Sequence, residues 1–466
     1  MYRLVKSSLR SKLLQDMETD VDASGKQNIL SQSLFFGDTL LTIDPENIKH
    51  ILSTNFRDFN IGLRSKQLSI VLGDGIFTED GQAWAHSRAM LKPQFARYQI
   101  TNFDMFDKHV EELLAVFRKQ GAGTYSNRLF EVRQMFQCLT LDFSVEFLLG
   151  ESIDSFKEDR MPLDGDPENP SPHDFIHALG YASEFVIRRA QIGSLYFLAD
   201  SPQFRKHIDT CHRFMDVFVR RALRIQRGEE KQNDTSRYVF INELAKDTQD
   251  PIQLRDQCMN ILSAGRSTTA SLLTMCMFYL ARYPDVWEKL KEEVIATFGE
   301  DKSGINPNNI RSCQYLRAVV NEVIRIRSIV PLNVRQPNKD VTLPRGGGPD
   351  GTEPILVEKG TTILMSFYTM QRSPLYWGQD AKSFNPDRWI NAKYNDHHPW
   401  AFTPFGGGPR ICLGQQLATN ETYYTIIRLA QTFKRVFTSF EEAQKEPLFN
   451  SAATLVVKDG VWVNFE

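Results

Sequence analysis

A ten-residue stretch near the end of the chain, Phe405–Gly414 (FGGGPRICLG), constrains the fold more than any other. Glycine and proline make up half of it, so we expect a constrained loop, followed by a helix-favouring run from Leu413 to Leu429. Its single cysteine, Cys412, has two interpretations. A rigid loop presents it as a thiolate to a haem iron, since cysteine is one of few axial haem ligands, or it is a buried thiol beside a glycine-rich turn. The rest of the sequence has to decide between them.

Composition excludes several classes of protein. The 466 residues are 41% hydrophobic and 24% charged, and no Ser/Gly- or Pro-rich linker divides them, so we expect one large domain. A formal net charge of −2 and the lack of basic runs with interleaved aromatic residues argue against a nucleic-acid partner. The six cysteines show no C-x-x-C spacing, which argues against a zinc site or a disulfide framework and favours an intracellular protein.

The N-terminal residues 1–20 are polar and have a helical pattern. No apolar run there reaches the length of a signal peptide or a membrane span. We therefore expect an N-terminal segment, residues 1–38, without a membrane-spanning helix.

A helix is predicted to begin near Asp80, and it places Trp84 and Arg88 four residues apart on one face. An indole N–H beside a guanidinium suits the binding of an anionic group such as a carboxylate. A surface cation–π pair is an equally good interpretation of this spacing alone.

The longest predicted helix begins at Asp250-Pro251, an N-cap followed by proline at the first helical position, and runs to about Arg282. Its middle, Ala264-Gly265-Arg266-Ser267-Thr268-Thr269, is rich in poor helix formers. Small and hydroxyl side chains there allow a large group to approach the backbone, or a local bulge. A tolerated irregularity without function is the alternative.

Four features after this helix bear on the fold. Glu322 and Arg325 lie three apart on a predicted helix over 313–327, where a surface ion pair is the default interpretation. Residues 332–335 read as extended, and 384–389 as a polar-aromatic loop. Residues 454–463 are predicted to form a hairpin that turns at Asp459-Gly460.

The order of these features decides the interpretation of Cys412. The stretch Phe405–Gly414 matches F-x-x-G-x-R-x-C-x-G, the haem-binding loop of the cytochrome P450 family, at every fixed position. Four upstream motifs follow in that family's order: W-x-x-x-R at Trp84 and Arg88, A-G-x-x-T at Ala264, Gly265 and Thr268, E-x-x-R at Glu322 and Arg325, and F-x-P-x-R-W at Phe384, Pro386, Arg388 and Trp389. The chain therefore resembles this family from about residue 40 to its end.

The resemblance implies a fold and a set of cofactor contacts. The fold is mainly α with small β-sheets (α+β), a single large catalytic domain over residues 39–466, with haem between a long distal helix and the proximal cysteine loop and its helix. Cys412 is the implied iron ligand, within a loop whose backbone N–H groups tune the thiolate. The other implied haem contacts are Phe405, Gly408, Gly414, Ala264 and Gly265, with Arg410, Trp84, Arg88 and Arg335 at the propionates. Glu322, Arg325 and Arg388 resemble the family's structural triad.

The distal residues depart from the family's usual pattern at one position. Thr268 resembles the alcohol that hydrogen-bonds iron-bound dioxygen, but the preceding residue, commonly Asp or Glu, is Ser267 here. A hydroxyl relays a proton through water but does not supply one at neutral pH. We therefore expect altered oxygen activation, or less usual chemistry such as rearrangement.

The sequence around the motifs resembles that of the fungal alkane and fatty-acid ω-hydroxylase subgroup. The segments that carry this are Gly73–Phe77, Trp84–Arg88 and Asn321–Arg335. The resemblance implies an aliphatic substrate, or the aliphatic part of a metabolite, since fungal relatives also tailor polyketides and terpenoids. By family position the pocket is lined by Val330, Leu332, Val334, Ala452 and Ala453.

The implied activity is a haem-thiolate monooxygenase that inserts one atom of O₂ into a C–H bond. Because the chain carries no flavin or nicotinamide domain, NADPH–cytochrome P450 reductase is the implied electron donor, with cytochrome b5 as a further partner. We expect a monomer, and the family implies association with the endoplasmic reticulum membrane. Two alternatives stay open: a haem-thiolate isomerase or dehydratase that needs no reductase, and a non-catalytic haem- or lipid-binding module.

Overall fold

The protein is known from a computed structural model that describes residues 11–31, 38–95, 103–121, 128–157, 162–166, 168–231, 238–390, 398–451 and 453–466. Their contacts divide the chain into two compact units. Unit 1 comprises Met1–Gly62, Phe106–Phe136 and Thr268–Glu466, and unit 2 comprises Leu63–Met105 and Gln137–Ser267. Helices dominate both, and the strands form only small sheets, so the prediction of a mainly α protein is confirmed.

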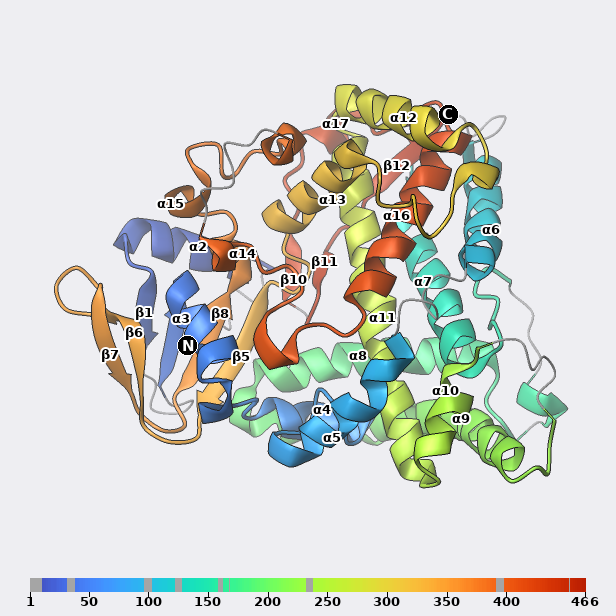
Figure 1. The fold of residues 1–466 in the computed structure, drawn as a ribbon, viewed down its shortest axis with the longest axis horizontal. Helices are drawn as coiled ribbons and strands as arrows, with labels where there is room; N and C mark the ends of the chain where they lie inside the picture. The colour runs from blue at the N-terminus through green and yellow to red at the C-terminus, as the bar shows by residue number, and fades with distance from the viewer. Residues whose placement is uncertain are drawn as a thin grey trace. The chain divides into compact units, whose positions relative to one another are not determined.

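Unit 1 contains a five-stranded sheet with the strand order β1-β2-β8-β5-β3. Strands β2 and β8 run parallel, and the other neighbours are antiparallel. The strands are β1 (Asn28–Ser31), β2 (Thr39–Thr42), β3 (Phe59–Asn60), β5 (Leu332–Pro337) and β8 (Thr362–Ser366). Beside them lie α2 (Leu13–Ser24), α3 (Pro45–Lys49) and the hairpin of β6 (Val341–Gly347) and β7 (Glu353–Val357) (Figure 1).

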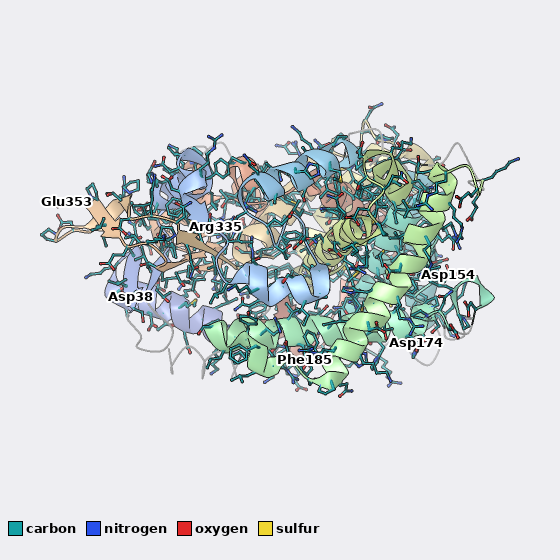
Figure 2. The ribbon with its side chains drawn as sticks, turned by 90° about the horizontal axis from the view of Figure 1, so that it is seen from below. Asp38, Asp154, Asp174, Phe185, Arg335 and Glu353 are labelled. Carbon is teal, nitrogen blue, oxygen red and sulfur yellow. The ribbon has the colours of Figure 1, made fainter. Side chains whose placement is uncertain are left out.

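A cluster of buried apolar side chains joins these elements, among them Leu40, Ile48, Ile363 and Met365. Side chains alternate across a strand, so β2 and β8 each turn part of their residues to this core. Figure 2 labels Arg335 on β5 and Glu353 at the exposed start of β7. Because β1 belongs to the sheet, the chain before residue 39 takes part in unit 1, and the domain boundary at residue 38 stays a prediction.

Unit 1 also contains helices beyond the sheet. They are α12 (Pro284–Phe298), α13 (Gln314–Ile326), α14 (Phe367–Met370), α15 (Pro374–Trp377), α16 (Gln415–Thr432) and α17 (Phe440–Ala443). One of them, α13, carries Glu322 and Arg325. Helix α12 contacts both α13 and α16. The Glu293 carboxylate of α12 accepts the backbone N–H of Tyr315 at 2.8 Å, which fixes the start of α13.

The predicted hairpin over 454–463 is wrong. Strand β11 (Leu455–Val457) pairs with β10 (Phe449–Ser451), whereas β12 (Trp462–Phe465) pairs with β4 (Phe130–Glu131) and β9 (Val436–Phe437). A turn does lie at Asp459-Gly460, where Gly460 has a φ of +77°. The flanking strands find partners distant in sequence, which local turn chemistry does not encode.

Unit 2 is helical. Its helices are α4 (Arg64–Leu72), α5 (Gly81–Leu91), α8 (Pro172–Gln191), α9 (Pro202–Gln226) and α10 (Phe240–Asp247). Helix α8 begins with a reciprocal capping box between Ser171 and Asp174, and it packs on α9 through the stacked rings of Phe175 and Phe214, 4.0 Å apart. Figure 2 labels Asp174 near the start of α8 and Phe185 farther along it.

Three helices belong to both units along their length: α6 (Phe103–Gly121), α7 (Val132–Leu149) and α11 (Pro251–Leu280). Helix α11 begins as predicted, because the Asp250 carboxylate accepts the Ile252 N–H at 2.9 Å and proline follows it. It is continuous over all 30 residues, so the bulge that the weak helix formers permit does not occur. None of the described helices has the length and apolar character to cross a membrane.

Candidate active site

The predicted residues are divided between the two units. In unit 1 the loop that carries Cys412 is closed by its own backbone. The Cys412 N–H donates to the Phe405 carbonyl at 3.0 Å, and the Ile411 N–H donates to the Gly408 carbonyl at 3.0 Å. Because both ends of the loop are joined, its chain path is fixed where the thiol leaves it. The loop ends at Gly414, the N-cap of α16.

Three glycines of this loop are each required for a different structural reason. Gly408 has a φ of +67°, and a Cβ there would overlap the Leu52 carbonyl, so the loop packs directly on the π-helical turn His50–Thr54. A Cβ on Gly407 would overlap the Trp400 ring. Gly406 has a φ of +73° but open space around it, so its requirement is conformational alone.

The Cys412 side chain differs from the other five cysteines. It is exposed, whereas Cys138 is half-buried and the remaining four are buried. Burial raises the pKa of the Cys211 thiol to about 12 and that of Cys313 to about 11, so these thiols stay protonated. The partial positive charge at the N-terminus of α16 favours a thiolate at Cys412. An accessible thiol on a fixed loop is the donor that a haem-thiolate centre requires.

The other predicted cofactor contacts of unit 1 lie in varied environments. Phe405, Arg410 and Gly414 are half-buried in the loop. Arg335, on β5, is 5% exposed, and its guanidinium donates to the Asn333 side chain at 2.9 Å and to the Val334 carbonyl at 2.8 Å. These bonds hold the Arg335 side chain along its own strand.

In α11 the predicted distal residues lie in a stretch of the helix that is accessible. Residues 256–262 and 269–280 are buried, whereas the six residues 263–268 are each half-buried. This stretch contains Ala264, Gly265, Ser267 and Thr268. Small and hydroxyl side chains therefore make up most of a half-buried stretch in the middle of an otherwise buried part of this helix.

Unit 2 supplies a reason for Gly265 that the sequence does not reveal. A Cβ on Gly265 would come within 2.9 Å of Ser144 Oγ on α7. One turn earlier on α7, Thr140 Oγ1 donates to the Arg266 carbonyl at 2.7 Å. The small residue at 265 therefore allows α7 and α11 to pack closely, whatever further role it has.

Trp84 and Arg88, on α5, lie together as their spacing predicts. The Arg88 guanidinium carbon is 5.8 Å from the centre of the Trp84 ring, with Trp84 buried and Arg88 half-buried. This geometry is compatible with the anion-binding pair and with the cation–π pair.

The structure brings Glu322, Arg325 and Arg388 together, and all three side chains are at most 1% exposed. The Glu322 carboxylate accepts two bonds from Arg325, each 2.8 Å, and one from Arg388 Nε at 3.3 Å. It also accepts the Trp389 indole N–H at 2.9 Å and the Asn385 N–H at 3.0 Å. The surface-pair interpretation of Glu322 and Arg325 is wrong, because this cluster is fully buried and joins α13 to the 3-10 turn Pro386–Trp389.

The predicted pocket-lining residues have unequal exposure. Leu332 and Val334 are half-buried, Val330 is 40% exposed and Ala453 is exposed. Ala452 lies outside the described residues.

One buried acid was not anticipated from the sequence. Glu421 on α16 is 4% exposed, and its side chain is hydrogen-bonded to Thr269, the residue after Thr268. Desolvation raises its pKa well above the ordinary value for glutamate, although the Thr269 bond lowers it in part. No sequence signal marks this acid, because its neighbours Asn420 and Thr422 are polar as well.

Comparison with known proteins agrees with the sequence motifs. The sequence model of the cytochrome P450 family matches residues 26–460. The chain is 42% identical to cytochrome P450 52A9 of Candida maltosa over 408 residues, which cover 86% of this chain and 77% of the relative. It is 42% identical to cytochrome P450 52A10 of the same yeast over 432 residues (92% and 82%), and 39% identical to cytochrome P450 52E1 of Candida apicola over 439 residues (94% and 83%). The predicted family is thereby confirmed: the chain belongs to the cytochrome P450 family of haem-thiolate monooxygenases, which work with a redox partner, O₂ and a hydrophobic substrate.

Proposed function

We propose that this protein inserts one oxygen atom of O₂ into a C–H bond of an alkane, a fatty acid or the aliphatic part of a fungal metabolite. The second oxygen atom leaves as water. The substrate class rests on the resemblance of Gly73–Phe77, Trp84–Arg88 and Asn321–Arg335 to the fungal ω-hydroxylases. The observation that carries the chemistry is the accessible Cys412 thiol on a loop closed by its own backbone.

Cys412 would hold the haem iron, and Arg410, Arg88, Trp84 and Arg335 would bind the propionates. Haem bound through a thiolate supplies O₂ activation, since the thiolate pushes electron density towards O–O cleavage. Phe405 would shield the sulfur, and Gly408 keeps the loop pressed against the turn at Leu52. The half-buried band of α11 would hold Thr268 and Ser267 at the oxygen side.

The partner and the cellular site belong to the same proposal. NADPH–cytochrome P450 reductase, with cytochrome b5 as a further donor, would supply electrons to a monomer associated with the endoplasmic reticulum. Turnover that needs no NADPH would favour an isomerase or dehydratase instead.

Replacing the proposed ligand tests the assignment of Cys412. In Cys412→Ser the haem, if retained, should lose the thiolate-type Soret band of the reduced carbon-monoxide complex, because a hydroxyl is not a thiolate donor. Cys138→Ser removes a half-buried thiol elsewhere and should keep the band. A Cys412→Ser protein with an intact thiolate band would contradict the proposal.

Ser267 tests the role of the distal hydroxyls. A carboxyl group beside Thr268 should raise the fraction of NADPH consumption that ends in product, by severalfold in Ser267→Asp, because an acid supplies the proton that a hydroxyl only relays. The side chain in Ser267→Asn has the size of the Asp side chain but no acidic proton. This variant should therefore bring no improvement in coupling. Equal coupling in the Asp and Asn variants would show that proton supply at this position is not limiting.

A further inference from the structure

His398, which precedes the cysteine loop in unit 1, is hydrogen-bonded through both nitrogens of its ring. Nδ1 accepts the backbone N–H of Trp400 at 3.2 Å, and Nε2 lies 2.6 Å from Oε1 of Glu46 on α3. An imidazole whose Nδ1 accepts a hydrogen bond carries its proton on Nε2. Nε2 therefore donates to the Glu46 carboxylate, and the two bonds fix both the tautomer and the orientation of the ring.

Glu46 is held as an anion in this pair. The hydrogen bond from His398 lowers the pKa of Glu46 below its ordinary value, burial acts in the opposite direction, and the charges of Lys49 and Arg345 lower the pKa further. The Lys49 Nζ lies 3.7 Å from Oε2, so the two carboxyl oxygens face different partners. Hydrogen bonds to an ionised acceptor are stronger than neutral ones. The link between α3 and His398 is therefore a charge-assisted one.

Trp400 extends this link into the cysteine loop. Its ring packs on the buried apolar cluster of unit 1, and a Cβ on Gly407 would come within 2.4 Å of that ring. Because His398 accepts the Trp400 N–H, it determines where the backbone of Trp400 lies. The place of the ring against Gly407 thus depends on His398.

One early segment of the chain, residues 45–54, supports the loop at two neighbouring glycines. Helix α3 contacts the 3-10 turn Pro399–Ala401, and the π-helical turn that follows α3 contacts the 3-10 turn Gly408–Arg410. The second support is the Leu52 backbone, whereas the first depends on two side chains. Since the loop is closed by its own hydrogen bonds up to Cys412, a shift at either support moves the thiol.

We propose that Glu46 and His398 position the cysteine thiolate: their hydrogen bond, transmitted through Trp400 to the loop, fixes where Cys412 meets the haem iron. Both act through other residues and are positioning residues. Interactions beyond the ligand itself orient a metal ligand and tune the potential of the metal, so loss of this link should alter the haem as well as the loop. The proposal rests on the function proposed above, because it takes Cys412 as the iron ligand.

Two substitutions remove the link. In Glu46→Ala and His398→Phe, amide hydrogen exchange across the peptide Phe405–Cys412 of the holoenzyme should become severalfold faster, because the loop opens more often. The haem reduction potential should shift, and part of the thiolate-type Soret band of the reduced carbon-monoxide complex should be lost. The variants are compared with the unmodified protein at equal haem content.

Three further variants separate positioning from general stability. Glu46→Gln keeps a neutral acceptor for Nε2 and should restore most of the unmodified behaviour. His398→Asn keeps an acceptor for the Trp400 N–H, in the manner of an Asx turn, but is too short to reach Glu46, so it should behave like Glu46→Ala. The matched control is Asp22→Ala, which removes the exposed 2.7 Å pair with Lys382 on α2 and should change none of the three quantities.

The outcomes distinguish this inference from the proposed function. If the unmodified protein lacks the thiolate band, the proposed function fails. If the band is present and Glu46→Ala and His398→Phe match Asp22→Ala in exchange, potential and band, only the inference fails. A lower melting temperature without a change in those three quantities would overturn it too, since the link would then be structural. Loss of haem from Glu46→Ala but not from Glu46→Gln or Asp22→Ala would support it.

Discussion

Gly408 shows how one missing side chain determines the path of the cysteine loop. Its positive φ and its approach to Leu52 are two separate demands, and each excludes an ordinary side chain. Gly406 in the same loop carries the first demand without the second. Comparing Gly406 with Gly408 therefore separates the conformational requirement from the packing requirement.

Alanine at these two positions should separate strain from overlap. Gly406→Ala should cost about 1 kcal/mol, the price of a left-handed alanine, and should retain haem. Gly408→Ala should cost several kcal/mol more because the Leu52 backbone has to move, and haem content should fall sharply. Haem-to-protein ratio and thermal unfolding measure both effects, and equal loss in the two variants would contradict the packing argument.

At the scale of elements, the buried cluster around Glu322 joins α13 to the chain just before the cysteine loop. Arg325 also donates to the carbonyls of Gln371 and Ala381, each at 2.7 Å, and Arg388 donates to Asp380 at 2.7 Å. One helix therefore fixes several loop segments through hydrogen bonds to their backbones. A buried network of this kind is satisfied only when all of its members are present.

Neutralising Glu322 should lower the free energy of unfolding far more than neutralising an exposed glutamate. Glu322→Gln leaves the buried Arg325 guanidinium without its counter-charge and removes one of the two carboxylates that Arg388 contacts, so the free energy of unfolding should fall by about 3–5 kcal/mol. Glu184→Gln breaks the exposed i,i+4 pair with Arg188 on α8 and should change it by about 0.5 kcal/mol or less. Denaturant unfolding of the two variants compares them directly, and similar small losses would show that the cluster is not a stability element.

At the scale of the whole molecule, Glu421 makes stability depend on pH in an unusual direction. The unfolded chain ionises this carboxyl near pH ~4.3, whereas burial keeps the pKa of the folded state well above its ordinary value. Between these two pKa values the unfolded state has released a proton that the folded state keeps. The Glu421 contribution to stability is therefore complete below the lower pKa and is lost as pH rises.

The difference between the unmodified protein and Glu421→Gln isolates this group from other titrating residues. From about pH 5 upward the free energy of unfolding of the unmodified protein should fall relative to the variant by up to about 1.4 kcal/mol per pH unit. Chemical denaturation at several pH values measures the slope. Parallel curves would mean that Glu421 is ionised in the folded protein.

Local signals made much of this fold predictable. The start of α11 follows from Asp250-Pro251, and the constrained loop Phe405–Gly414 follows from its glycines and proline, because caps and turns depend on neighbours in sequence. The hairpin at Asp459-Gly460 failed since strand partners are chosen over long distances. Glu421 lies in no recognised spacing, and only its three-dimensional surroundings reveal a buried acid next to Thr269.

In unit 1, residues near the start of the chain contact residues near its end, and this has a consequence for biosynthesis. Ser11 bonds Asn450 across 439 residues, Glu18 of α2 pairs with Arg372, and the strand Trp462–Phe465 completes a sheet with Phe130–Glu131. At roughly 5–20 residues per second, α2 waits about 20–90 s on the ribosome before its partners exist. Over that interval its apolar face depends on chaperones, whereas the continuous segment Gln137–Ser267 of unit 2 has already been synthesised. A nascent chain that stops before Trp462 lacks the strand that pairs with Phe130–Glu131. Unit 1 then stays incomplete, and the chain becomes a substrate for cellular quality control.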